Sequence, residues 1–203
     1  MRGGTGSGQA RGMRLTYLAP PFLVAAYGVV RLVDGLDGSH GPGPAWTIGH
    51  VLFLVALLGF GWVAVDLWRR LRTVPALVAA AATLLGLAAF VHTVVVDLLV
   101  GAGAADRAEM NLRYQDHDTP LDPVAPLYPL GFTVLVLLFA IAARRAYWSP
   151  VLVLVGYLAI VANLDLLPIA GLLILGASIP AARGNDVGVR ATKGPHGRQH
   201  AGI

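Results

Sequence analysis

The 203-residue chain contains no cysteine and only one lysine, and charged residues make up just 13% of it. The absence of cysteine excludes disulfides, thiol catalysis, iron–sulfur clusters and covalently attached haem. Because no lysine lies in an apolar segment, a retinal Schiff base is excluded there as well. The scarcity of charge, combined with 56% hydrophobic residues, is typical of a chain that lies mostly in lipid.

The motifs of several common enzyme classes are also missing. We find no GxxxxGKS/T, GxSxG, HExxH or strand-associated GxGxxG pattern, so nucleotide, acyl-transfer and zincin chemistry lack support. The net charge of +4 would fit nucleic-acid binding in a soluble protein, but the arginines cluster at the ends of apolar segments, where they orient helices. We therefore expect the lipid bilayer as the partner and no nucleic acid. The sequence identifies no cofactor.

Five apolar regions are read against the roughly 20 residues that a membrane-crossing helix needs. The fifth, residues 150–180, would measure about 46 Å as one helix, which overshoots the bilayer. A turn from Asn163 to Asp165 divides it, because Asn163 can end one helix and Asp165 can cap the next, with Pro168 in its first turn. We predict an all-α, polytopic transmembrane bundle of six helices, the last two forming a short hairpin, over about 15–36, 46–68, 74–100, 124–143, 150–163 and 166–180.

The two ends of the chain differ in composition from the apolar domain at 15–180. Residues 1–14 and 181–203 are rich in glycine and basic residues and are predicted to be flexible tails, and Met13 offers an alternative start to Met1. A cleaved signal peptide is the alternative interpretation of the first apolar segment, but that segment lacks an Ala-x-Ala site and begins with two prolines. Farther along, Ser149 and Pro150 are typical of an N-cap and a first helical position.

Arginine placement predicts the orientation. Three arginines precede the first helix, three fill the connection between helices two and three, and two fill that between four and five. The positive-inside tendency places these segments in the cytoplasm, and the acidic connections at 37–45 and 101–123 outside. A hairpin at 150–180 returns the basic C-terminal tail to the cytoplasm as well. Together with an excess of alanine, valine, leucine and arginine, this indicates a bacterial inner-membrane protein with both termini cytoplasmic.

Ionisable residues inside the apolar segments carry the functional hypothesis, because each is costly in lipid. Counted at 1.5 Å per residue from the outer end of each predicted helix, four of them lie within about 12 Å of the outer surface: His50, His92, Asp97 and Asp165. We expect the third helix to be central, so that His92 and Asp97, about 140° apart around it, can meet different neighbours. The candidate ligand or ion site consists of His50, His92, Thr93, Asp97, Asn163 and Asp165.

Three roles remain open for this group. The side chains can hydrogen-bond between helices and lock the bundle, or they can handle a proton, an ion or a small solute. The alternative is a membrane enzyme or electron carrier that binds a metal or non-covalent haem through His50 and His92, although their spacing matches no recognised ligand pattern. The outer loop offers a weaker metal candidate in Asp116, His117 and Asp118, but such an acidic run is more often simply solvated.

Two further charged sets have structural interpretations. Asp66 precedes Arg69 and Arg70 by three and four residues, which is ion-pair spacing on a helix. Arg31 and Asp34 have the same spacing near the outer end of the first helix and are predicted to pair there. His196 and His200 are metal-like in spacing, but a polar tail is the better account.

Overall fold

The computed structural model describes residues 6–38, 40–117 and 121–183, and this part of the chain is all-helical, with no strand. Three short 3-10 segments, η1 (Gly35–Asp37), η2 (Asp122–Val124) and η3 (Leu164–Leu166), lie between the α-helices. The α-helices are α1 (Gly6–Asp34), α2 (Pro44–Leu71), α3 (Val74–Gly103), α4 (Arg107–Tyr114), α5 (Leu127–Ala143), α6 (Trp148–Ala162) and α7 (Leu167–Ala182).

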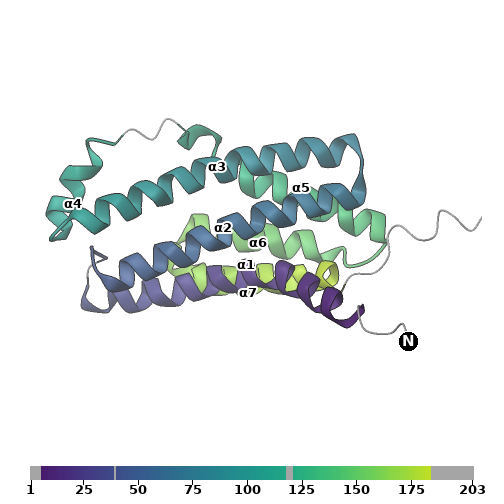
Figure 1. Ribbon diagram of the computed structural model, residues 1–203, viewed down its shortest axis with the longest axis horizontal. Helices are drawn as coiled ribbons and strands as arrows, with labels where there is room; N and C mark the ends of the chain where they lie inside the picture. Colours follow the sequence, from purple (N-terminus) through teal and green to yellow (C-terminus); the bar gives the residue numbers. More distant parts are fainter. Residues whose placement is uncertain (1–5, 39, 118–120, 184–203) are drawn as a thin grey trace, which may run out of the picture.

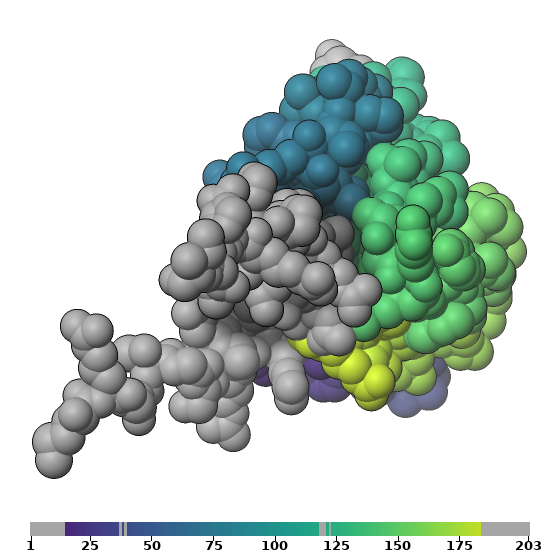
Figure 2. Space-filling model, turned by 90° about the vertical axis from the view of Figure 1, so that its right-hand side faces the viewer, coloured from purple at the N-terminus to yellow at the C-terminus, as the bar shows by residue number. Residues whose placement is uncertain are grey.

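All helices except α4 run up and down along one axis (Figure 1). One end of the bundle carries the α1–α2 connection, α4 and the α6–α7 turn, and we call it the His50 end. The other carries the α2–α3 and α5–α6 connections, and we call it the Arg70 end. Figure 2 looks onto the Arg70 end, with α3 and α5 side by side.

The long helices close a ring. Helix α1 packs against α2 and α7, α3 packs against α2 and α5, and α6 packs against α5 and α7. Helix α2 also reaches α5 across the ring, so α2 and α5 each contact three of the other ring helices, whereas α3, which the sequence predicted to be central, contacts two. For α2 the reason lies in its side chains, because Ala56 and Ala64 are small and fully buried and Leu67 is almost so.

Glycines allow two helix pairs to approach closely. A Cβ on Gly131 of α5 would lie 2.7 Å from both the carbonyl oxygen of Ala79 and the amide nitrogen of Thr83 on α3. A Cβ on Gly171 of α7 would lie 2.5 Å from the backbone nitrogen of Ala25 on α1. Small residues at such crossings let backbones pack together, as is common between membrane helices.

The surface of the bundle is apolar along the helices. Four of the described helices are long and apolar enough to cross a membrane, and α5 and α6 are shorter but also apolar. Soluble monomers rarely expose continuous apolar stripes of this kind, so the surface indicates a membrane-embedded protein. On α2 the exposed stripe consists of Val51, Val55, Leu58 and Trp62.

The structure has seven α-helices in its described part where the sequence predicted six. The additional helix is α4, which is eight residues long and polar, so hydropathy does not reveal it. Its start is capped by Asp106, whose carboxylate accepts a hydrogen bond from the amide of Glu109 at 2.9 Å. Met110 buries its side chain against Val96 and Val100 of α3.

The ends of the chain also differ from the sequence prediction. Helix α1 begins at Gly6, inside the segment 1–14 predicted as a flexible tail. Residues 1–5 and the tail beyond Arg183, with His196 and His200, lie outside the described residues.

The α6–α7 turn lies where the sequence placed a break, but its capping differs. Asn163 accepts a hydrogen bond from the amide of Asp165 at 2.8 Å, so Asn163 and not Asp165 caps the segment that follows. Helix α6 begins at Trp148, and the Ser149 hydroxyl, expected as its cap, instead donates to the carbonyl of Ala177 on α7 at 2.9 Å. Figure 1 shows that this turn stops short of the ends of α1, α2 and α3.

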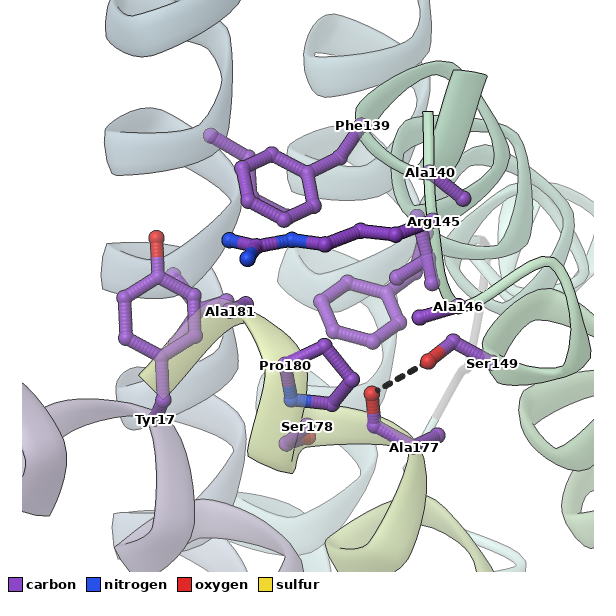
Figure 3. A pocket seen from close by; sticks show the side chains of 14 residues that line it. Tyr17, Phe139, Ala140, Arg145, Ala146, Ser149, Ala177, Ser178, Pro180 and Ala181 are labelled. Carbon is purple, nitrogen blue, oxygen red and sulfur yellow. Dashed lines mark hydrogen bonds between the residues drawn. The ribbon is translucent and has the colours of Figure 1, made fainter. Parts of the chain in front are cut away.

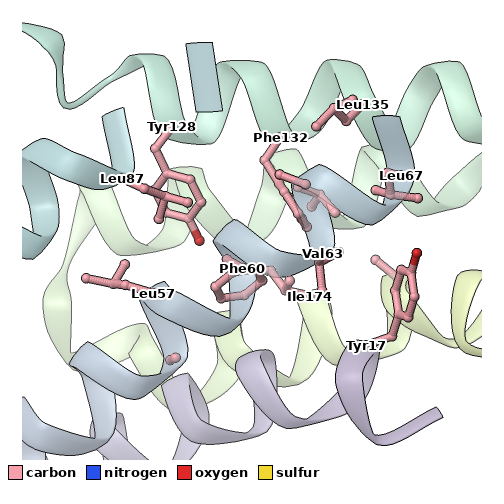
Figure 4. Close-up of a cluster of buried hydrophobic side chains, with 14 of the residues drawn as sticks. Tyr17, Leu57, Phe60, Val63, Leu67, Leu87, Tyr128, Phe132, Leu135 and Ile174 are labelled. Atoms are coloured by element: carbon pink, nitrogen blue, oxygen red, sulfur yellow. The ribbon is translucent and has the colours of Figure 1, made fainter. Parts of the chain in front are cut away.

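The core is built from aromatic and aliphatic side chains. Phe60 of α2 meets Phe132 of α5 edge to face, with ring centroids 5.2 Å apart. Figure 4 shows these rings between α2 and α5, with the hydroxyl of Tyr128 directed toward Phe60. Edge-to-face pairs of this kind add to the free energy gained by burying their area.

Candidate functional site

His50 lies nearly two turns inside α2 and is 95% buried, with a relative exposure of 5%. Its Nδ1 lies 2.8 Å from the carbonyl oxygen of Trp46. Because a carbonyl only accepts, Nδ1 must carry the hydrogen, and a neutral His50 therefore has its lone pair on Nε2. That Nε2 faces the Oδ2 atom of Asp97 on α3 at 3.6 Å.

Asp97 joins three helices. Its Oδ1 accepts a hydrogen bond of 2.7 Å from the hydroxyl of Tyr114 on α4. Its backbone carbonyl accepts a longer bond of 3.4 Å from the indole of Trp46 on α2. The indole fits there because residue 101 of α3 is glycine, whose Cβ position would lie 2.5 Å from the indole nitrogen. The carboxylate of Asp97 thus connects α4 to the end of the bundle.

A second set of charges lies on α1. The guanidinium of Arg31 is 3.6 Å from the carboxylate of Asp165 in η3, and the carboxylate of Asp34 is 3.7 Å from His40. The predicted pairing of Arg31 with Asp34 is therefore replaced by two contacts to other segments, because η3 and the α1–α2 connection both bring a partner within reach.

The two sets border one small hollow of about 10 Å³, roughly the space for one water molecule. Arg31 and Asp34 line it from α1, and Trp46 and His50 line it from α2. Tyr27 separates the hollow from the interior and meets the ring of His50 edge on, at 5.6 Å. We call this group the outer-end cluster; its charged members are Arg31, Asp34, His40, His50, Asp97 and Asp165.

Not every predicted site residue belongs to this cluster. His92 is half-buried on the face of α3 that also presents the exposed Val95 and Leu99, and it makes no hydrogen bond or ion pair with any described residue. Thr93 donates to the carbonyl of Ala89 within α3. Asn163 serves as a cap at the α6–α7 turn. The structure therefore joins His50 to Asp97, places Asp165 beside Arg31, and leaves His92 apart.

The outer loop gives the weaker metal candidate little support. The imidazole of His117 bonds to the carbonyl of Arg113 at 2.9 Å, and Asp116 is exposed, while Asp118 lies outside the described residues. Among the residues that the structure describes, no group of three or more histidine and carboxylate side chains is arranged to hold a metal ion.

Electrostatics at α4 follow from its contacts. The carboxylate of Glu109 accepts a hydrogen bond from the amide of Ala105 and pairs with Arg113, and these contacts lower the pKa of Glu109. Burial raises the pKa of Tyr114, and its hydrogen bond to Asp97 raises that pKa further. Tyr114 therefore stays a neutral donor at ordinary pH.

The Arg70 end holds a separate charged group. Arg70 donates to the carboxylate of Asp66 at 2.8 Å, which confirms the predicted pairing with Arg70, and the hydroxyl of Tyr17 donates to the same oxygen at 2.6 Å. Figure 3 shows Arg145 reaching into a small pocket of about 20 Å³ between Tyr17 and Phe139. These contacts join α1, α2 and the α5–α6 connection.

Sequence reasoning missed Arg31, Trp46 and Tyr114 as members or supports of the outer-end cluster. Trp46 precedes His50 by one helical turn, a signal that could have been used. Tyr114 follows Asp97 by 17 residues across a turn and a second helix, so no spacing rule finds it. Comparisons with known protein families, with curated proteins and with solved structures found no match for this chain.

Proposed function

We propose that the chain is a bacterial inner-membrane protein that binds and releases protons at the outer-end cluster, and that this cluster holds α4 against the outer face. In this proposal α1, α2, α3 and α5 each cross the bilayer, and α6 and α7 form a hairpin that enters it from the cytoplasmic side, so that both termini are cytoplasmic. The partner is lipid, and the role is that of a proton-responsive or proton-handling membrane protein.

The placement of arginine supports this orientation. Arg69, Arg70 and Arg72 lie at the Arg70 end, together with Arg144 and Arg145 of the α5–α6 connection. The positive-inside tendency assigns that end to the cytoplasm. Helix α6, with 15 residues, spans only about 22 Å, so the α6–α7 turn lies within the membrane thickness and needs polar or protein surroundings. Arg31 provides such surroundings for Asp165.

The single observation that carries the proton proposal is the orientation of His50. Its Nδ1–H is committed to the carbonyl of Trp46 at 2.8 Å, so Nε2 of a neutral ring and an ionised Asp97 would face each other as two acceptors at 3.6 Å. A proton on either group converts this repulsion into an attraction. The pair therefore holds one proton in the geometry observed.

The charge count of the cluster points the same way. It contains three carboxylates, Asp34, Asp97 and Asp165, and one guanidinium, and each of its two histidines faces a carboxylate. The guanidinium of Arg107 on α4 adds a second positive charge beside the cluster, where it donates to the carbonyl of His40 at 3.0 Å. Neutrality therefore requires one more positive charge, which protonation of one of the two histidines would supply. His40 lies in the α1–α2 connection at the end of the bundle and is partly exposed, so exchange of these protons with the outer solution would need no long path.

The alternative of a metal or haem held by His50 and His92 is not favoured by this geometry. His92 shares its face of α3 with exposed apolar residues, whereas His50 is buried against α1 and α3. The competing interpretation is that these contacts only hold the helices together. It differs from the proposal in one measurable respect, because such a structural role needs no change of protonation.

Potentiometric titration of the purified protein tests the proposal. Over the pH range in which the protein stays folded, His50→Gln should take up about one proton fewer than the unaltered protein. Asp116→Asn is the matched control, since this exposed carboxylate should leave proton uptake above about pH 5 unchanged. Equal proton uptake by His50→Gln and the unaltered protein would show that the cluster has only a structural role.

Topology is tested separately with single cysteines, since the chain has none of its own. On intact cells a membrane-impermeant maleimide should label Leu36→Cys, which is 83% exposed at the His50 end. Arg69→Cys at the Arg70 end should be labelled only after the cells are opened. The reverse pattern would contradict the orientation without bearing on the proton proposal.

A further inference from the structure

A cavity of about 160 Å³ lies inside the ring of helices. Side chains from α1, α2, α3, α5, α6 and α7 line it, and they are apolar apart from the hydroxyl groups of Tyr27, Tyr128 and Tyr157. No charged side chain contributes to its wall. An apolar cavity of about 150 Å³ in another protein holds a benzene molecule, so this space fits one planar ring.

The walls of the cavity are suited to a ring. Tyr27 and Phe53 stack at 4.9 Å, while Phe90 and Tyr157 each meet Tyr128 edge to face. Aromatic faces and edges bind planar rings by offset stacking and edge contacts. Water is a poor occupant of this space, because a buried water needs two to four polar partners and the cavity offers few.

Tyr157 and Tyr128 together provide one unused donor. Tyr157 is 92% buried, with a relative exposure of 8%, and its hydroxyl lies beside that of Tyr128. A bond between two hydroxyls uses only one of their two hydrogens, so one O–H of this pair has no acceptor within the described structure. A buried donor without an acceptor costs free energy, which a ligand carrying an acceptor oxygen would recover. The cavity therefore combines an apolar, ring-sized space with one hydrogen-bond donor.

The cavity reaches the surface beside the α6–α7 turn. Val161 and Leu164 line it there and are 83% and 48% exposed. This turn stops short of the ends of α1, α2 and α3 (Figure 1), so in the proposed orientation Val161 and Leu164 lie at membrane depth on the side of the bundle. A ligand would enter from the lipid and could leave an apolar tail there.

From these observations we infer that the cavity binds a lipid-soluble molecule whose head is a single planar ring bearing a carbonyl oxygen, the chemical class of the membrane quinones, with its tail leaving past Val161. We infer an uncharged head because the wall carries no charge, and a carbonyl because the pair of Tyr128 and Tyr157 has one O–H without an acceptor. The inference shares with the proposed function only the membrane setting, since no atom of the pair His50 and Asp97 lines the cavity.

Binding is tested with two probes that differ only in the carbonyl groups: a 1,4-benzoquinone with a ten-carbon alkyl chain, and benzene with the same chain. Each is titrated into protein in nanodiscs carrying ¹³C-labelled tyrosine, and the ring signal of Tyr157 is followed. We expect saturable shifts with both probes. Tyr128→Phe combined with Tyr157→Phe removes both hydroxyls, and binding is then followed through the signal of Tyr27, which also lines the cavity. This double variant should weaken quinone binding about three- to tenfold, as expected for one neutral hydrogen bond, and leave alkylbenzene binding unchanged.

Tryptophan substitutions at two positions of α6, Val161 and Val151, form a matched pair. Val161→Trp should block the opening and abolish saturation by both probes, whereas Val151→Trp, on the lipid-facing side of the same helix and outside the cavity lining, should not. Shifts that never saturate, or that persist in Val161→Trp, would show partition into lipid and overturn the inference. Equal quinone affinity in the double variant that lacks both hydroxyls would overturn the assignment of a carbonyl ligand. Normal binding in His50→Gln is expected whether or not the proton proposal holds.

Discussion

Tyr114 of α4 donates a hydrogen bond of 2.7 Å to the carboxylate of Asp97 on α3, although the two residues are 17 positions apart. This bond, together with the burial of Met110 against α3, fixes a short polar helix across the end of an apolar bundle. The same carboxylate faces His50 on α2. The protonation of one buried pair and the docking of α4 therefore share one group.

Removing the Tyr114 hydroxyl should loosen α4. A hydrogen bond to a charged acceptor contributes about 1.5–3 kcal/mol, so Tyr114→Phe should speed amide exchange in Arg107–Tyr114 by about tenfold or more, with little change in the rest of the bundle. Leu112→Ala is the control, because Leu112 is 63% exposed on the same helix. Unaltered exchange in Tyr114→Phe would show that the bond does not hold α4.

The stability of α4 should also depend on Glu109. The hydrogen bonds from Ala105 and Arg113 lower the pKa of Glu109 in the folded state, so its contribution is fully present above the ordinary carboxyl pKa of 4.5 and is lost as pH falls through the lowered value. Amide exchange in α4, corrected for its intrinsic pH dependence, should therefore rise in acid. Glu109→Gln should remove this acid dependence; an identical acid response in that variant would assign it to another group.

The close contact of α3 and α5 makes Gly131 sensitive to any side chain. In Gly131→Ala the new methyl would lie 2.7 Å from backbone atoms of Ala79 and Thr83, which cannot move aside as a side chain can. Overpacking of this kind costs about 1–3 kcal/mol. Gly176→Ala is the control, since its nearest neighbour would be a side-chain carbon of Leu152 at 3.8 Å. Unfolding in mixed micelles should show a loss for the first variant and none for the second.

The pair of Asp66 and Arg70 allows a charge effect to be separated from a hydrogen-bond effect. Asp66→Asn should cost at most about 1 kcal/mol, because the pair with Arg70 is partly exposed and an amide oxygen still accepts from Tyr17. Asp66→Leu should cost about 1–3 kcal/mol, since it leaves the buried Tyr17 hydroxyl without an acceptor.

Adding Tyr17→Phe to Asp66→Leu should restore part of that loss, because the donor and its missing acceptor are then both absent. The free energy of unfolding of the three variants measures this. A double variant no more stable than Asp66→Leu would place the cost elsewhere.

The helical class and the long apolar segments could be predicted from hydropathy, because 20 or so apolar residues leave few other structures. Helix α4 could not, since eight polar residues give no hydropathy signal and its position depends on Met110 and Tyr114 finding partners on α3. The cap of η3 was misassigned for a similar reason: Asn163 and Asp165 are both good caps, and only the approach of Arg31 draws Asp165 away.

The candidate site was predictable in part. Depth along a helix places His50, Asp97 and Asp165 at one end, and there the structure does bring charged partners to each of them. Depth along a helix does not tell in which direction a side chain points, however. His92 lies at a similar depth but on an outward face of α3. Which face of a helix turns inward is decided by neighbours such as Gly86 and Gly131, which fix how α3 meets α5.

The protonation state of His50 can be observed by ¹⁵N NMR of the imidazole nitrogens in protein labelled at histidine, assigned by His50→Gln and followed with pH. We predict that the ring passes from an imidazolium to a neutral form with the hydrogen on Nδ1, as its bond to Trp46 requires. Asp97→Asn should lower the imidazolium fraction of His50 at a given pH and leave the signal of His117 unchanged. A ring that stays neutral throughout, that carries its hydrogen on Nε2, or that titrates identically in Asp97→Asn would contradict proton binding by this pair.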